Sequence, residues 1–224
     1  MKRSQINNSL VWAAQLLASH NITLPRFAYW SMEDWKKNQG ITGVISTVMQ
    51  GWDITDFGSG DFEHVGAVLF TVRNGSLTER NMGTPYAEKY IMLEEGQQLP
   101  LHYHAVKTED IINKGGGLLS LTFYNSKQDG SVDYESDVEV YSDGIKLTCK
   151  AGEELIVTRG NSATITPGLY HLIAAKAEPL IIGEVSSVND DKTDNYFAEK
   201  SSRFARIEED ARPVFPLCNE YDKV

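Results

Sequence analysis

The sequence is poor in the residues that would place it in a disulfide-rich or membrane-spanning class of protein. Its 224 residues include only two cysteines, Cys149 and Cys218, which lie far apart in the chain. A chain of this size needs no disulfide, so we expect two free thiols and a reducing, cytoplasmic location. No apolar run approaches the roughly 18 residues that a membrane helix requires, and the short run near the N-terminus lacks the features of a signal peptide.

Basic residues are also in deficit. The chain has 21 Lys and Arg against 31 Asp and Glu, which gives a formal net charge of −10. Binding to nucleic acid or to an anionic membrane would need clustered Lys and Arg, so the charge balance argues against both partners. A neutral or cationic small molecule is unaffected by this argument. The 41% hydrophobic content is that of an ordinary soluble protein with a sizeable core.

The first 60 residues predict helices and loop. Apolar side chains recur every three or four positions over residues 4–19, which indicates an amphipathic helix. A short second helix is expected to begin at Ser31, because Ser can cap it and Glu33 and Asp34 complement the positive end of its dipole. Residues 40–60 have no clear period, and we expect loop there with at most one short strand.

From His64 onward the sequence predicts an all-β structure. Short runs rich in β-branched and aromatic residues alternate with Gly, Asn and Asp, which is typical of a sandwich or barrel. Asp143-Gly144 predicts a tight hairpin, because Gly accepts positive φ. We therefore expect one domain over residues 1–224, with helical and loop decoration at 1–60, a barrel at 61–190 and a C-terminal extension at 191–224. The expected strands are 65–72, 86–94, 99–105, 118–124, 136–141, 145–149, 154–158, 162–166, 169–175 and 180–186.

Four residues have the pattern of a metal site. His102 and His104 are two apart, so on a strand they point to the same face, and Glu109 follows five residues later. These side chains can converge on a cation if the chain turns back, and His171 would complete the set from a distant strand. Three imidazoles and one carboxylate suit Mn or Fe and leave two positions of an octahedron for a substrate or water. A lone histidine is usually no ligand, so the spacing as a whole carries this prediction.

That spacing resembles a known family. Residues 96–116 read G-x5-H-x-H-x4-E-x6-G, which reproduces the first cupin motif in full. The second cupin motif is matched in part by Gly160, Pro167, Gly168 and His171, with Pro and Gly adjacent. The resemblance covers about residues 85–186 and implies a cupin jelly-roll β-barrel with N-terminal helices.

A second resemblance is longer and more specific. The strings MKRSQIN at 1–7, LPLHYHAVKTED at 99–110, VNDD at 188–191 and LCNEY at 217–221 are similar to the D-lyxose isomerase family. The resemblance implies a manganese-dependent, homodimeric aldose–ketose isomerase. Its expected substrates are D-lyxose and D-xylulose, with D-mannose and D-fructose as related sugars.

Isomerisation of this kind moves a proton between adjacent carbons of an opened sugar. A metal on both oxygens can stabilise the enediolate, and a base must reach the carbon-bound proton. The candidates are Lys89, Lys107, Glu109 and Asp190. Lys89 alternates with apolar residues and is expected to face the barrel interior, whereas Lys107 lies in a turn and could equally be solvated. Glu109 is expected as a ligand that can also shuttle a proton, and Asp190 or Asp191 as a contact to sugar hydroxyls.

Two other functions fit the same ligands. A cupin dioxygenase would use them with iron and O₂, and a non-catalytic sugar-binding cupin would bind without turnover. A phosphorylated substrate is disfavoured, since no Gly-rich anion cradle or Arg cluster lies near the metal motif.

Overall fold

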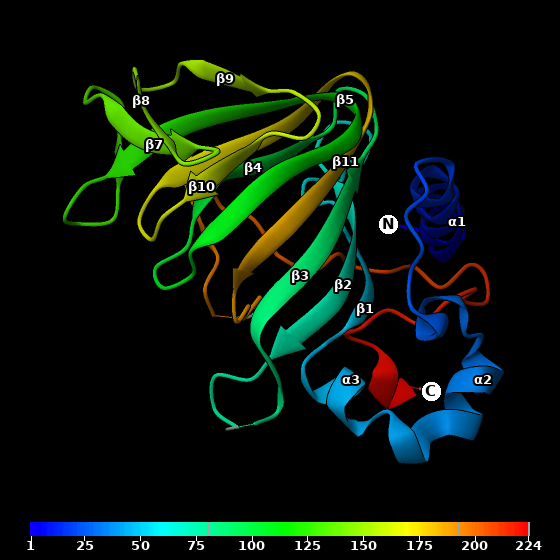
Figure 1. Cartoon of the computed structure of the whole chain (residues 1–224). Coiled ribbons are helices and arrows are strands. Elements are labelled where there is room, and N and C mark those ends of the chain that lie inside the picture. The colour runs from blue at the N-terminus through cyan, green and yellow to red at the C-terminus, as the bar shows by residue number, and fades with distance from the viewer. Residues whose placement is uncertain (80, 192, 224) are drawn as a thin grey trace.

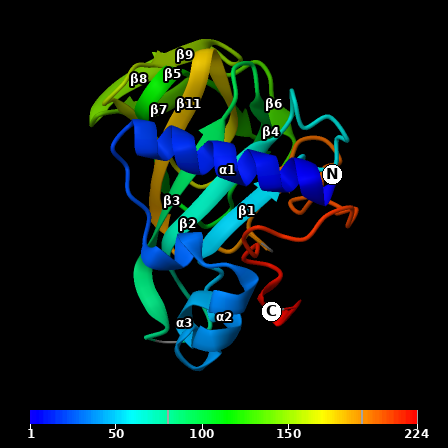
Figure 2. The same ribbon diagram turned by 90° about the vertical axis from the view of Figure 1, so that its right-hand side faces the viewer.

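The computed structural model describes residues 1–79, 81–191 and 193–223. Its first helix, α1 (Arg3–Ser19), agrees with the predicted helix. The apolar face of α1 is buried through Ile6, Leu10, Ala13 and Leu17. Figure 2 shows α1 lying across the outer face of the sheet that contains β1, β2 and β3.

Helix α2 (Met32–Asn38) begins at Ser31 as predicted, with a capping box in which Ser31 and Asp34 each accept a bond from the other's backbone N–H. The expectation of loop over residues 40–60 was partly wrong. The segment contains α3 (Gly43–Thr47) and the strand β1 (Gly51–Thr55). A five-residue helix is too short to show a periodic pattern, so sequence could not reveal α3. Three 3₁₀ turns complete the helical elements of the described residues, at Arg26–Tyr29, Gln39–Ile41 and Tyr221–Lys223.

The strands of the described residues pair antiparallel in one 12-stranded sheet. At its centre β5 and β11 pair along most of their length. The main order of strands is β1-β2-β3-β11-β5-β10-β7-β8. Outside this order, β4 pairs with β11 and β12, and β6 and β9 pair with β5. The strands are β2 (Ala67–Gly75), β3 (Gly83–Leu93), β4 (Gln98–Tyr103), β5 (Glu109–Ser126), β6 (Val132–Asp133), β7 (Val138–Ser142), β8 (Ile145–Cys149), β9 (Glu154–Val157), β10 (Ser162–Ile165), β11 (Tyr170–Ser187) and β12 (Tyr196–Phe197).

The long strands differ from the predicted pieces. The sequence predicted 118–124 where β5 has 18 residues, and it divided β11 into 169–175 and 180–186. The reason is a bulge between Lys176 and Leu180, opposite Gly116, which has φ of +82°. Glycine at a bulge bends a strand without ending it. The glycines between the short runs, which suggested strand ends in the sequence, therefore lie at bends within long strands. Figure 1 shows β5 and β11 passing side by side through the barrel.

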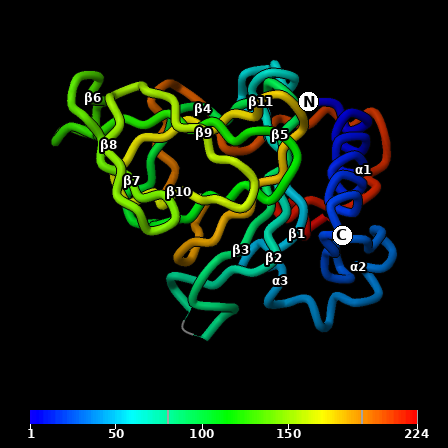
Figure 3. The backbone as a smooth tube through the Cα atoms, turned by 45° about the horizontal axis from the view of Figure 1, so that its top comes forward, coloured from blue at the N-terminus to red at the C-terminus, as the bar shows by residue number. Residues whose placement is uncertain are grey.

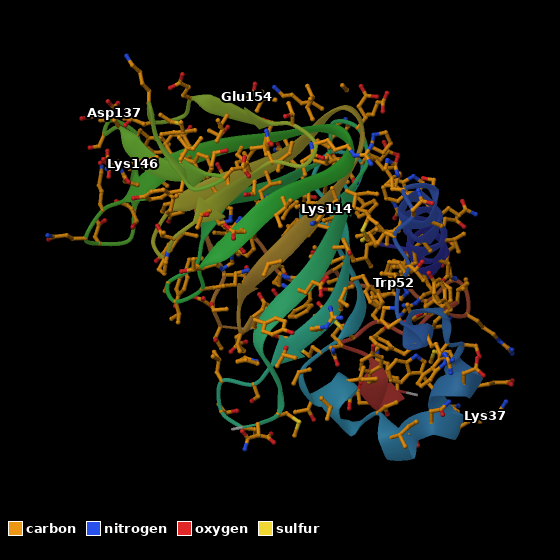
Figure 4. The ribbon with its side chains drawn as sticks, in the orientation of Figure 1. Lys37, Trp52, Lys114, Asp137, Lys146 and Glu154 are labelled. Carbon is orange, nitrogen blue, oxygen red and sulfur yellow. The ribbon has the colours of Figure 1, made fainter. Side chains whose placement is uncertain are left out.

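Two apolar cores follow from this arrangement. One fills the barrel interior, with Leu69, Ile91, Phe123 and Ile173 among its members. The other lies between α1 and the outer face of the sheet and includes Trp52, which Figure 4 labels beside the helical side of the molecule. Figure 3 shows β6, β7 and β8 at the end of the barrel remote from α1.

The structure therefore confirms the predicted fold class, an antiparallel cupin-like β-barrel with N-terminal helices. It also confirms the Asp143-Gly144 hairpin, where both residues have positive φ between β7 and β8. Both cysteines are free and buried. Among the described residues, no helix has the length and apolarity to cross a membrane. The division into 1–60, 61–190 and 191–224 remains a prediction, although β12 of the extension pairs with β4 of the barrel.

Candidate metal centre

Three histidines meet inside the barrel. His102 near the end of β4 pairs in register with His171 on β11, and His104 follows two residues after His102. One ring nitrogen from each of the three lies within 4.8 Å of the other two, and all three side chains are buried. The structure thus brings together the local pair and the distant histidine that the spacing predicted.

The second nitrogen of each ring has a defined partner. Nδ1 of His102 lies 2.8 Å from the carbonyl of Pro100, and Nδ1 of His171 lies 3.0 Å from the carbonyl of Leu169. Nδ1 of His104 contacts the carbonyl of Asp194. A carbonyl only accepts, so each Nδ1 carries the proton and each Nε2 presents a lone pair. This arrangement of outer-shell bonds is the usual one for metal-binding imidazoles.

Glu109 starts β5 and faces the same point. Its Oε1 lies 3.1 Å from Nε2 of His171 and 3.5 Å from Nε2 of His104. Despite this short distance, the buried Nε2 of His171 makes no hydrogen bond within the part of the chain that the structure describes. Burial alone would raise the pKa of Glu109, but Lys107 and His104 hold it well below its ordinary value, so the group is a carboxylate. Four electron-pair donors therefore converge in a buried place, and a divalent cation fits them.

Lys107 is buried beside Glu109 rather than solvated in its turn. Its Nζ lies 2.5 Å from Oε2 of Glu109, 3.0 Å from Oε1 of Glu184 and 3.3 Å from Oδ1 of Asn189. Burial alone would lower the pKa of Lys107, but the two carboxylates raise it above its ordinary value. Lys107 is therefore a cation at neutral pH, which disfavours it as a base.

Lys89 faces the barrel interior, as its alternation with apolar residues predicted. It is 2% exposed, and its Nζ lies 3.4 Å from Asp191 and 3.7 Å from Glu184. Glu184 is its register partner across β3 and β11. The same pocket thus holds Lys89, Lys107 and two carboxylates that are not candidate ligands.

Of the two aspartates considered as sugar contacts, Asp191 lines this pocket and Asp190 does not. Its carboxylate contacts Arg203 at 3.1 Å in addition to Lys89, and Arg203 lies 2.8 Å from Asp53. The side chain of Asp190 accepts a bond from Thr193 and lines a neighbouring pocket, which Asp191 also borders.

Sequence reasoning missed Glu184 and Arg203. Glu184 did leave a signal, because it is the only charged residue in the apolar run 180–185 of a predicted strand. A carboxylate at such a position needs a buried partner. The pocket is lined by Phe57, Leu69, Lys89, Ile91, Leu99, His102, His104, Lys107, Glu109, Ile111, Ile173, Glu184, Asp191, Asn195 and Arg203.

The interior of the antiparallel barrel thus holds a buried three-histidine cluster that could bind a metal ion, beside paired lysines and carboxylates, as the active site of an enzyme would. The profile of the D-lyxose isomerase family matches residues 1–221. The chain belongs to the D-lyxose isomerase family, as its resemblance predicted.

Known proteins similar to the chain agree with this family. A D-lyxose/D-mannose isomerase of Escherichia coli O157:H7 is 39% identical over 99% of the chain and 98% of its own length. The protein of that name from Serratia proteamaculans is also 39% identical, with the same coverage. Among solved structures, the L-ribose isomerase of Acinetobacter sp. DL28 in complex with L-ribose has a TM-score of 0.62 at 13% identity, covering 93% of the chain and 98% of that structure. The L-ribose isomerase of Cellulomonas parahominis with L-ribose has a TM-score of 0.59 at 14% identity, with the same coverage. At these identities, the similarity to the two L-ribose isomerase structures concerns the fold alone.

Proposed function

We propose that the chain interconverts free D-lyxose and D-xylulose, and D-mannose and D-fructose, by moving a proton between adjacent carbons of the opened sugar. The observation that carries the proposal is the convergence of Nε2 from His102, His104 and His171 with Oε1 of Glu109, next to two buried lysines. The names of the relatives support the choice of sugars. They also favour an isomerase over the oxygenase and the binding module.

In this proposal His102, His104, Glu109 and His171 hold a divalent metal ion, most consistent with Mn²⁺ because the donors are imidazoles and one hard carboxylate oxygen. When bound, the ion would act as a Lewis acid on the sugar oxygens. The Nδ1 bonds to backbone carbonyls fix the orientation of the three imidazole rings before the ion arrives.

The other pocket residues are assigned roles by their charge. Lys107 is held as a cation and donates hydrogen bonds, so it is suited to stabilise negative charge that develops on a sugar oxygen. Lys89 lies between Glu184 and Asp191, where it can donate to a second oxygen or move a proton. Glu109, Glu184 and Asp191 are the carboxylates that contact these lysines, and Asp191 is also paired with Arg203. We therefore assign the transfer of the proton between the two carbons to Glu109, Glu184 or Lys89.

The pocket favours an uncharged sugar. In the described part of the pocket, each of the cations Lys89, Lys107 and Arg203 already contacts a carboxylate. A phosphate group would need a cation that is not already neutralised, so the phosphorylated sugars should be poor substrates. Asp190 borders the neighbouring pocket and remains our candidate for contact with a sugar hydroxyl.

We further infer a cytoplasmic homodimer. The resemblance to the family supports the dimer, and the free, buried cysteines suit a reducing compartment. Light scattering of the purified protein tests the oligomeric state.

The experiment that tests the function is anaerobic incubation of Mn²⁺-loaded protein with a panel of free pentoses, hexoses and one sugar phosphate. We expect ketose from D-lyxose and D-mannose, abolished by chelation. A preference for the phosphate in kcat/KM would refute the free-sugar proposal. Oxygen consumption without isomerisation would instead support the dioxygenase.

A further inference from the structure

We propose that Asp194 is a positioning residue that fixes both His104 and Lys107 through one turn. Residues 104–108 connect β4 to β5 and so carry the chain from one pair of candidate ligands to Glu109. Asp194 lies some 90 positions later in the segment between β11 and β12, and it is buried. The inference rests on the proposed metal site and goes beyond it, because Asp194 is neither a candidate ligand nor one of the residues that line the pocket.

The main chain of Asp194 acts on His104. Its carbonyl accepts the Nδ1 proton of His104, which leaves Nε2 as the free nitrogen of that ring. His102 and His171 are held instead by the carbonyls of Pro100 and Leu169, each two residues before the histidine. His104 is therefore the histidine whose orientation depends on a distant segment of the chain.

The side chain of Asp194 acts on the rest of the turn. Oδ1 accepts from the backbone N–H of Ala105 at 2.7 Å, and Oδ2 accepts from the N–H of Lys107 at 3.0 Å. The N–H of Val106 lies 3.3 Å from both oxygens. A carboxylate that accepts from three successive N–H groups fixes the local backbone, because charged hydrogen bonds are the stronger ones.

The two ends of the turn are also held by the main chain, since the carbonyls of His104 and Thr108 accept from the N–H groups of Gly168 and Ser187. Between them Val106 is 70% exposed, and the N–H groups of residues 105–107 bond to the Asp194 carboxylate. The backbone N–H of Lys107 is held by Asp194 while its Nζ reaches Glu109 and Glu184 in the pocket. The position of the Lys107 ammonium therefore depends on Asp194 at one end and on the two glutamates at the other.

Replacing Asp194 should weaken metal binding without unfolding the protein. The test compares Asp194→Ala and the isosteric Asp194→Asn with the parent protein by calorimetric titration with Mn²⁺ and by the visible spectrum of the Co²⁺-loaded protein. Both substitutions keep the main-chain carbonyl that bonds His104, but they remove or neutralise the carboxylate that ties residues 105–107 to residue 194. The turn can then move away from that carbonyl. We expect a loss of metal affinity towards the roughly 10- to 100-fold that a lost partner of a metal ligand typically costs. We also expect a changed Co²⁺ spectrum as His104 becomes less fixed, and a circular dichroism spectrum like that of the parent.

The matched control is Asp133→Asn. Asp133 also accepts from two backbone N–H groups, those of Glu135 and Ser136, but neither of these residues is a candidate ligand or lines the pocket of the candidate ligands. We expect this variant to bind metal like the parent.

Parent-like metal affinity and Co²⁺ spectrum in folded Asp194→Asn would overturn the inference. If both Asp194 variants unfold in the absence of metal while Asp133→Asn does not, the residue serves general stability and the inference is also wrong. Failure of the parent to bind metal would instead contradict the proposed function.

Discussion

Glu184 stands opposite Lys89 in the register of β3 and β11, yet its carboxylate lies closer to Lys107, at 3.0 Å against 3.7 Å. It therefore connects the two lysines of the pocket, one from a strand and one from a turn. Lys107 in turn contacts Glu109 at 2.5 Å, so opposite charges alternate from Lys89 to the candidate metal ligands. A change of charge at any of these residues should therefore alter the electrostatic environment of the others.

The double variant His102→Ala/His104→Ala should lose its metal and keep its fold. Removing two of the four donors leaves too few ligands for stable binding, whereas the barrel core does not depend on them. Metal analysis of the purified variant, with circular dichroism as the check on folding, tests this. Stoichiometric metal in the folded variant would refute the site.

Glu109→Gln should weaken metal binding and activity together. The substitution removes the negative charge that both the ion and Lys107 require, while the size of the side chain is kept. We expect the metal affinity to fall by at least about 100-fold, because losing a residue that only hydrogen-bonds to a metal ligand already costs about 10- to 100-fold. Glu139→Gln, an exposed carboxylate paired with Lys146, is the matched control and should bind metal normally. Normal metal binding with lost turnover would make Glu109 a catalytic group only.

Lys89→Met should spare the metal and lower kcat. Lys89 contacts carboxylates and none of the four candidate ligands, so its removal should act mainly on the transition state. The expected loss is about 10²- to 10⁴-fold, the usual contribution of a positioned proton donor or acceptor. Lys146→Met, on the exposed strand β8, serves as the control. Unchanged kinetics in Lys89→Met would leave Glu184 or Glu109 to move the proton.

The largely buried carboxylate of Asp191, whose side chain is 17% exposed, should make stability depend on pH on the acid side. Burial alone would raise the pKa of Asp191, but Arg203 and Lys89 hold it well below its ordinary value. Because the pKa of Asp191 is lower in the folded protein than in the unfolded chain, its carboxylate stabilises the folded state at pH values above the unfolded pKa. This contribution is lost as the pH falls towards and through the pKa of the folded state. We therefore expect the urea midpoint to fall from about pH 4 downward.

The matching variant is Asp191→Asn. It should lose about 2 kcal/mol at pH 7, the size of a hydrogen bond to a charged group, and should show a weaker acid dependence than the parent. Identical pH profiles for the two proteins would assign the acid dependence to other carboxylates.

Much of the metal site was predictable because its pattern is local. His102, His104 and Glu109 lie within eight residues, and the two-residue period of a strand places both histidines on one face. Lys89 was predictable for the same reason, from alternation along one strand. His171 needed the cupin resemblance, because its distance to His102 depends on how β4 and β11 pair.

The rest of the pocket depends on tertiary contacts that have no local pattern. Arg203 reaches Asp191 from the C-terminal extension, and the choice between Asp190 and Asp191 depends on how the chain turns after β11. The burial of Lys107 in a turn was equally unpredictable, since turn residues are ordinarily solvated. It is explained by Glu109 and Glu184, which offset the cost of burying its charge.

The distribution of pocket residues along the chain has a consequence for biosynthesis. All four candidate ligands have been synthesised once residue 171 is made, but Glu184, Asp191, Asp194 and Arg203 follow later. A nascent chain that has reached residue 171 therefore carries every metal donor, while His104 still lacks the carbonyl that orients it. Metal captured at that stage would be held in an open, water-accessible barrel. Selection of the right ion should consequently occur only after the chain has been made through Arg203 and has closed the wall of the pocket.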